Sequence, residues 1–231
     1  MWGWNMKKLL LTSGILNAIC LITLILFLGI QLPAFGMWFY RWQYGANDTY
    51  QQVNMEPEHL HEVTRHMIRY MQGREPDLQI MTTVAGEERY FFSEIEIRHM
   101  IDVYNLFAIG LTVQNVLIAL FLLTLGLFLF KGRNHLPYLY KSWQIGTAAV
   151  FLSLSALVLL IALNWHHAFV VFHEIFFDND YWILDSRVDL LINIVPYDFF
   201  IATSIFIGGF FAAGLGILFA LSTLALRRRK A

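Results

Sequence analysis

The sequence predicts a mainly α-helical membrane protein with four transmembrane helices. Of its 231 residues, 58% are apolar and only 14% are charged, and the mean hydropathy of +0.55 lies outside the range of ordinary soluble domains. A helix needs about 20 apolar residues to cross a bilayer. Four stretches meet this requirement, at 9–32, 106–130, 143–165 and 201–226. We expect the whole chain to form one membrane domain.

The basic residues predict which side of the membrane each end faces. Lysine and arginine concentrate in the short cytoplasmic segments of membrane proteins. Here they precede the first span, lie between the second and third spans, and close the chain: Lys7, Lys8, Lys131, Arg133, Lys141 and residues 227–230. All acidic residues fall in 33–105 or 166–200. We therefore expect cytoplasmic termini and an extracellular cap formed by these two segments.

The first apolar run is expected to remain as a membrane anchor. No small-x-small cleavage site follows it, as a removed signal peptide would require. It contains Cys20, the single cysteine of the chain, so an intrachain disulfide is excluded. No small residue directly precedes Cys20, as a lipobox would require. We expect Cys20 to pack in the membrane or face lipid.

The first cap segment predicts an amphipathic helix followed by a short β-hairpin. Between Pro57, which fits the first turn of a helix, and Gly73, a typical stop, apolar residues recur at helical spacing. The runs 78–84 and 89–92 flank the sequence Ala-Gly-Glu-Glu, a pattern that favours two paired strands. The cap should therefore contain both elements.

A second helix should begin at the end of this cap segment. Ser93 and Glu96 have the spacing of a capping box, and the helix that they begin should continue into the second span. His99 and Asp102 then lie about one turn above the membrane on one face of that helix.

Several kinds of site are excluded or disfavoured by the sequence. It contains no Gly-x-Ser-x-Gly elbow, phosphate-binding glycine loop or dinucleotide fingerprint. His173 and Glu174 resemble the start of a zincin helix, but position 177 is phenylalanine. His59, Glu62 and His66 share a helical face and could bind a metal, although ordinary surface histidines explain them better because no further ligand group supports them. We expect no cofactor.

Nucleic-acid binding and transport are also disfavoured. The basic run at 227–230 directly follows a span, so it indicates topology rather than a nucleic-acid site. The four spans contain no charged residue, and no inverted repeat is evident.

Three polar groups could carry chemistry, and each has two open interpretations. A polar group at membrane depth indicates function, but His173 could also pack its ring at an interface while its nitrogens reach water, as aromatic residues commonly do there. His99 with Asp102 could form an oriented base or a simple surface pair. Asp185 and Asp189 could face one way on a helix and hold a histidine, an arginine or an amine, or Asp185 could cap a helix.

These residues together resemble a known family. The resemblance rests on Phe172-His173, Phe176-Phe177, Trp182-x-x-Asp185-x-x-x-Asp189, Leu191-Ile192, Pro196 and Phe199-Phe200, joined with His99-Met100-x-Asp102-Val103. The set is similar to the lipoprotein intramolecular transacylases of Gram-positive bacteria, as is the plan of four spans with an outer cap. Ser186 departs from the family pattern, in which we expect proline, and this affects the local turn.

The resemblance implies an enzyme of the bacterial cell membrane that acts on diacylglyceryl-modified lipoproteins at the extracellular face. It would move the sn-2 acyl chain of the glyceryl group to the α-amine of the same substrate's N-terminal cysteine, which gives the lyso form. Two histidines are catalytic in that family, and by motif match they are His99 and His173 here. Substrate lipoproteins and membrane lipid are thus the expected partners, and the oligomeric state is open.

Acyl transfer within one molecule fits the residues at hand. It needs no covalent enzyme nucleophile, only proton transfer, donors to the oxyanion and an oriented substrate. We expect His173 to act as the general base and His99 as its partner, with Asp102, Asp185 and Asp189 orienting or tuning them. The candidates for the walls of an aromatic substrate pocket are Phe91, Phe92, Tyr104, Phe172, Phe176, Phe177, Tyr181 and Trp182.

A second class also fits the sequence: a non-enzymatic membrane scaffold or pH-responsive sensor. Its acidic extracellular cap would bind a cationic partner or respond to pH through its histidines. Normal function of a variant with both His99→Gln and His173→Gln would favour this class, because interaction surfaces tolerate such changes.

Overall fold

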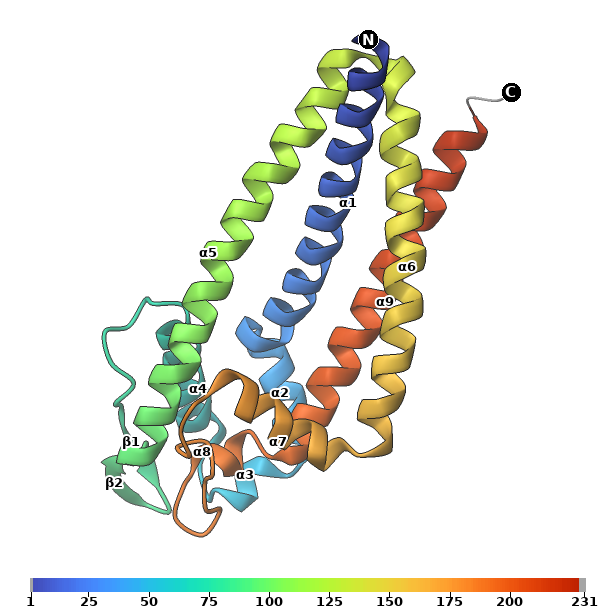
Figure 1. Cartoon of the computed structure of the whole chain (residues 1–231). Coiled ribbons are helices and arrows are strands. Elements are labelled where there is room, and N and C mark those ends of the chain that lie inside the picture. The colour runs from blue at the N-terminus through green and yellow to red at the C-terminus, as the bar shows by residue number, and fades with distance from the viewer. Residues whose placement is uncertain (1, 229–231) are drawn as a thin grey trace. The chain divides into compact units, whose positions relative to one another are not determined.

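The computed structural model describes residues 2–228, and within them the side chains of all but residues 2–5 and 154–163. The elements follow in the order α1 (Trp2–Phe35), α2 (Met37–Ala46), α3 (Thr49–Gln52), α4 (Pro57–Met71), β1 (Met81–Val84), β2 (Glu87–Tyr90), α5 (Glu94–Lys131), the 3-10 turn η1 (Arg133–His135), α6 (Leu136–Leu163), α7 (Trp165–Phe176), α8 (Leu191–Ile194) and α9 (Tyr197–Arg227). Figure 1 traces them along the chain. The chain divides into two compact units.

The first unit is built from long helices. It comprises Met1–Gly29, Thr112–Trp165 and Gly208–Ala231, and so contains most of α1, all of α6 and the later parts of α5 and α9. Helix α1 contributes to both of its apolar clusters. Ile22 of α1 packs with residues of α9, and Leu10 of α1 packs with residues of α5 and α6. The unit is therefore a helix bundle organised around α1.

A buried asparagine links three helices of this bundle. Asn17 of α1 has no exposed surface, and its amide nitrogen donates to the Thr124 hydroxyl at 2.8 Å and to the Phe121 carbonyl at 3.1 Å on α5. Its amide oxygen accepts from the Trp143 indole of α6 at 2.9 Å. Because buried polar groups are costly when unpaired, these bonds fix how α1, α5 and α6 pack. Cys20 is also fully buried in this unit, so it is a packing residue.

The second unit contains the shorter elements and the polar ends of the long helices. It comprises Ile30–Leu111 and His166–Ile207. Its core takes large apolar side chains from α2, α4, the hairpin, the first turns of α5, α8 and α9, including Phe39, Leu60, Phe91, Met100, Ile194 and Phe199. The hydroxyls of Tyr44 on α2 and Thr64 on α4 share a 2.7 Å hydrogen bond inside this core.

The predicted amphipathic helix and hairpin are both confirmed. Helix α4 runs from Pro57 to Met71 and buries the expected apolar stripe, and Gly73 follows it with φ +70°. Strands β1 and β2 pair antiparallel with Val84 opposite Glu87. The connecting turn is shorter than the expected four residues, because Ala85 and Gly86 adopt φ +54° and +84°, as a tight two-residue hairpin turn requires.

Among the residues that the structure describes, three helices are long and apolar enough to cross a membrane: Met6–Phe35, Glu94–Lys131 and Tyr197–Arg227. The expected span at 143–165 falls largely in α6, which ends at Leu163 and includes the undescribed side chains of 154–163. Arg229 and Lys230 of the basic terminal run also lie outside the described residues. The fold is thus mainly helical with three membrane-length helices and a small hairpin among the described residues.

We predict that Asn17→Leu destabilises the protein by about 1–3 kcal/mol, because the Trp143 N–H then stays buried without an acceptor. Thermal unfolding in detergent measures the effect. Thr12→Val is the matched control, since the Thr12 hydroxyl is exposed and bonds only within α1. Equal melting temperatures for Asn17→Leu and Thr12→Val would contradict this role of Asn17.

Candidate active site

Helix α5 begins with a capping box that also holds a second segment. The Ser93 amide donates to the Glu96 carboxylate at 2.5 Å, and the Glu96 amide donates to the Ser93 hydroxyl at 3.4 Å, as the sequence predicts. The other Glu96 oxygen accepts from the Leu191 amide at the start of α8. Glu96 is fully buried. Burial raises the pKa of this carboxyl, and the bonds from Ser93 and Leu191 act in the opposite direction.

The loop between α7 and α8 is attached to the first turns of α5 by side chains. Asn179 donates to the Asp102 carboxylate at 2.9 Å, and the Arg98 guanidinium contacts the Tyr181 hydroxyl at 3.4 Å. Asp102 therefore bonds an asparagine of the loop, and no hydrogen bond joins it to His99 in the described part of the chain. These contacts hold the loop beside the helix that carries His99.

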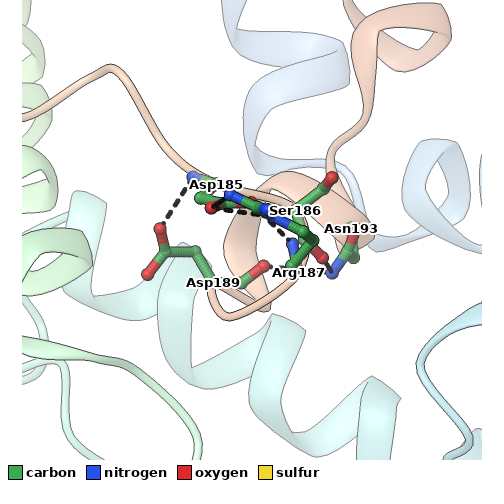
Figure 2. Close-up of polar contacts among 5 residues, drawn as sticks. All are labelled: Asp185, Ser186, Arg187, Asp189 and Asn193. Atoms are coloured by element: carbon green, nitrogen blue, oxygen red, sulfur yellow. Dashed lines mark hydrogen bonds and ion pairs between the residues drawn. The ribbon is translucent and has the colours of Figure 1, made fainter.

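Asp185 and Asp189 stabilise a turn in this loop, which Figure 2 shows. Asp185 accepts from the backbone and guanidinium of Arg187, and Asp189 accepts from the Asp185 amide at 2.8 Å and from the Ser93 hydroxyl at 2.9 Å. The interpretation that both acids face one way on a helix is wrong, because residues 186–188 form a turn and α8 begins only at Leu191, but Asp185 does hold an arginine, Arg187. The alternative, a helix cap by Asp185, is wrong for the same reason.

Ser186 lies in the same turn. The Ser186 carbonyl accepts from the Asn193 side chain at 2.8 Å, and Asn193 also bonds the Asp189 carbonyl at 3.0 Å. The Asn193 side chain thus closes the turn.

His173 on α7 is buried and has a defined tautomer. Its side chain is 6% exposed, and its Nδ1 lies 2.7 Å from the Phe169 carbonyl one turn earlier. A carbonyl oxygen only accepts, so Nδ1 carries the hydrogen and Nε2 keeps its lone pair. The imidazole stacks on the Trp182 ring with an interplanar angle of 28° and a distance of 4.7 Å between ring centroids. The centroid of the Phe169 ring lies 4.2 Å from that of His173. His173 is therefore a buried, oriented proton acceptor.

His99 on α5 faces the same surroundings. Its ring centroid lies 6.2 Å from that of His173, with Phe177 at 5.4 Å from His99 and 5.7 Å from His173. The described residues provide no hydrogen bond between the two imidazoles. This spacing allows one substrate group to contact both rings.

Burial lowers the pKa of both histidines. The first residues of α5 lie outside its apolar stretch, because they include four charged side chains: Glu94, Glu96, Arg98 and Asp102. The pKa of His99 falls from 6.5 to about 4. Burial is the largest cause and the nearby His173 the second, while the charge of Asp102 raises the pKa and partly opposes them. Burial also lowers the pKa of His173, against its bond to Phe169. Both imidazoles are therefore neutral at pH 7.

The predicted aromatic residues separate into two groups. Phe172, Phe177 and Trp182 contact His173 directly. Phe176 packs on Phe172, and Tyr181 binds Arg98. The other three belong to the apolar core cluster of the second unit and make no described ring contact with either histidine: Phe91, Phe92 and Tyr104.

Sequence reasoning missed Phe169 and Asn179. Phe169 stands four residues before His173, the spacing at which a helical carbonyl and ring meet an imidazole. That spacing could have identified Phe169, whereas no sequence signal joins Asn179 to Asp102.

The structure gives no support to a metal site on α4. Within the described ranges, no group of three or more His, Cys, Asp or Glu side chains is placed to hold a metal ion. His66 Nε2 lies 3.1 Å from the Asp77 carbonyl oxygen. His59 lines a cavity of about 520 Å³ together with residues 50–51, residues 54–57, Thr83 and Gly86. This cavity does not include His99 or His173.

The fold and this site define a membrane-integral helical protein with a histidine pair suited to proton transfer. Residues 15–200 match the family model of the lipoprotein intramolecular transacylase Lit. The chain therefore belongs to the Lit family of lipoprotein intramolecular transacylases. No curated protein sequence matches it.

Solved structures of one relative share the fold. The membrane-integral lipoprotein intramolecular transacylase Lit from Bacillus cereus superposes with a TM-score of 0.75 at 21% identity, over 98% of each chain. A variant of it with one histidine replaced by alanine gives a TM-score of 0.74 at 19% identity, over 100% of this chain and 99% of the other. A variant with one histidine replaced by arginine gives a TM-score of 0.70 at 21% identity, over 99% of this chain and 96% of the other.

We predict that Glu96→Gln destabilises the protein by about 1–3 kcal/mol, because the new amide group cannot accept one of the two buried backbone N–H bonds. Chemical or thermal unfolding measures the change. The control is Glu94→Gln, since Glu94 is exposed and its ion pair with Arg98 contributes less than about 1 kcal/mol. Similar losses in both variants would refute the special role of Glu96.

The two histidines should also titrate below the usual range. Because burial disfavours the imidazolium, we expect His173 to titrate below 6.5 and His99 near pH 4. Both rings then stay neutral at pH 7, and each ring loses its proton-accepting capacity as the pH falls through its own lowered pKa. NMR titration of ¹³C-labelled histidine, assigned with His99→Gln and His173→Gln, measures both values. A midpoint above 6.5 for either ring would overturn the assignment.

Proposed function

We propose that this chain moves the sn-2 acyl chain of a diacylglyceryl-modified lipoprotein to the α-amine of that substrate's N-terminal cysteine. Family membership supports the substrate class. The observation that carries the proposal is the pair of neutral imidazoles 6.2 Å apart, with Nε2 of His173 free to accept a proton. The product is the lyso form of the lipoprotein.

The reaction balances within one substrate molecule. The amine nitrogen attacks the ester carbonyl carbon, so a C–N bond forms and the carbonyl electron pair moves to oxygen. When that pair returns, the ester C–O bond breaks and the glyceryl oxygen leaves. One proton passes from nitrogen to this oxygen, which gives an amide and a free hydroxyl without an external reactant.

The histidines divide the proton transfers. Attack makes the nitrogen cationic and strongly acidic, so even a weakly basic imidazole can accept its proton. His173 Nε2 takes this role because Nδ1 is already bonded to Phe169. His99 either passes the proton that His173 has accepted on to the leaving oxygen, so that both imidazoles end neutral, or stabilises the oxyanion. Asp102 tunes His99 through its charge, while Asp185 and Asp189 act indirectly by holding the loop.

Orientation of the substrate supplies much of the rate. The amine and the ester must meet through a strained ring, and such pre-orientation can lower a barrier by about 7–11 kcal/mol. The rings around His173, from Phe169, Phe172, Phe177 and Trp182, give apolar walls for the acyl chain and the glyceryl group. The same apolar walls favour a neutral amine, which is the reactive form.

The site is proposed to lie at the extracellular face of the bacterial cell membrane, in a chain with four spans and cytoplasmic termini. The distribution of basic residues supports this orientation. The polar first turns of α5 and the loop before α8 then meet the substrate at the level of the lipid headgroups, where mature lipoproteins carry their diacylglyceryl anchor.

Expression in a host that makes only diacylglyceryl lipoproteins tests the function. Mass spectrometry of a lipoprotein's N-terminal peptide should show an N-acylated, lyso-form cysteine with the wild-type chain. His173→Ala and His99→Ala should each reduce conversion at least about 100-fold, because general acid–base catalysis contributes 10²–10⁴-fold.

His167→Ala is the matched control, since His167 is exposed on the same helix α7 as His173, and it should convert substrate like the wild type. Membrane accumulation is measured for every variant by immunoblot. Unchanged diacylglyceryl-cysteine with the wild-type chain would overturn the proposed function, and full conversion by His173→Ala would overturn the assigned base.

A further inference from the structure

The indole of Trp182 presents a hydrogen-bond donor that the described chain leaves unused. Its ring stacks on His173 at 4.7 Å, and its Nε1 is shielded from solvent with no hydrogen-bond partner in the described residues. An indole nitrogen donates and cannot accept. A buried donor without an acceptor costs free energy, and the few that persist in native structures call for a reason.

The backbone on both sides of Trp182 is held by hydrogen bonds. Before it, the Asn179 side chain accepts from the Tyr181 amide at 3.0 Å and donates to Asp102 on α5. After it, the Leu184 amide donates to the Trp182 carbonyl at 3.1 Å, and the Asp185 amide donates to Asp189. The position of the indole is therefore fixed in advance, as a donor for a transient charge requires.

The proposed reaction needs a hydrogen-bond donor to the oxyanion in addition to those that the two histidines provide. The tetrahedral intermediate places negative charge on the former carbonyl oxygen, and this charge needs hydrogen-bond donors. His173 uses Nδ1–H for the Phe169 carbonyl and must keep Nε2 free to accept a proton. His173 therefore offers nothing to the oxyanion. The single N–H of His99 serves either the leaving oxygen or the oxyanion, so a further donor is needed.

We propose that the Trp182 indole N–H donates a hydrogen bond to the acyl carbonyl oxygen as this becomes the oxyanion. The inference rests on the proposed function. The indole proton stays on nitrogen throughout, since the electron pair that moves to oxygen when the C–N bond forms returns when the ester C–O bond breaks. Because neighbouring side chains shield Nε1, the substrate reaches it only after they move aside.

The Trp182 ring contributes in two ways: its N–H is a hydrogen-bond donor, and its face stacks on His173. Two substitutions distinguish these contributions. Trp182→Phe keeps a ring face for stacking and removes the N–H. Replacement of Trp182 by β-(3-benzothienyl)alanine keeps the bicyclic shape and exchanges only the N–H for sulfur. A loss common to both variants is due to the missing donor.

We expect both variants to lower kcat for the N-acyl shift by about 100-fold to 1,000-fold, the usual effect of removing one oxyanion donor. KM should change little, because the charge develops only in the transition state. The melting temperature of the benzothienyl variant should not fall, since no hydrogen bond is lost. Time courses with purified enzyme and a diacylglyceryl lipopeptide in lipid, with mass-spectrometric detection, measure these values.

Trp143→Phe is the matched control, because its indole N–H does have a partner, the Asn17 side chain. This variant should melt about 2–4 °C lower, as a loss near 1 kcal/mol predicts, while its kcat stays at the wild-type value. The comparison thus separates the Trp143 N–H, which stabilises the fold, from the Trp182 N–H, which is proposed to act in the reaction.

The outcomes separate the inference from the proposed function. If the wild-type enzyme does not produce the N-acyl shift, the proposed function fails. If the wild-type enzyme does produce it and the benzothienyl variant keeps its kcat, the inference about Trp182 is overturned and the function stands. If only Trp182→Phe loses rate, the ring shape matters and the N–H does not, which also overturns the inference.

Discussion

The arrangement of the second unit depends on one buried carboxylate. Glu96 accepts from the Ser93 amide at the start of α5 and from the Leu191 amide at the start of α8, so one side chain joins two segments far apart in the sequence. Burial without these bonds would be prohibitive for a charge. The bonds therefore place the loop of Asn179 and Trp182 against the helix that carries His99.

The histidine pair derives its properties from that placement. His173 belongs to α7 and His99 to α5, their ring centroids lie 6.2 Å apart, and the loop that follows α7 is attached to α5. The apolar rings around them disfavour charge, and a backbone carbonyl selects the tautomer of His173. A site of this kind holds proton acceptors ready at neutral pH, as acyl transfer between groups of one substrate requires.

Local patterns were reliable where a single segment decides the outcome. The spacing of Pro57 and Gly73, the hairpin sequence, and the Ser93–Glu96 box each correspond to observed elements, because helical periodicity and turn chemistry act over a few residues. The helix proposed for Asp185 and Asp189 was wrong. Their carboxylates satisfy amides, a hydroxyl and an arginine in a turn, and spacing alone cannot distinguish these partners from those on a helix.

The sequence by itself determined the membrane class and the family resemblance, because composition, periodicity and motif residues are properties of the linear chain. Only the tertiary structure decided that Asp102 bonds Asn179, that Phe91, Phe92 and Tyr104 pack in the core of the second unit, and that Phe169 and Trp182 enclose His173. These facts depend on which buried groups meet across long sequence separations. Such meetings are set by the packing and hydrogen-bonding of the whole unit, which no local pattern encodes.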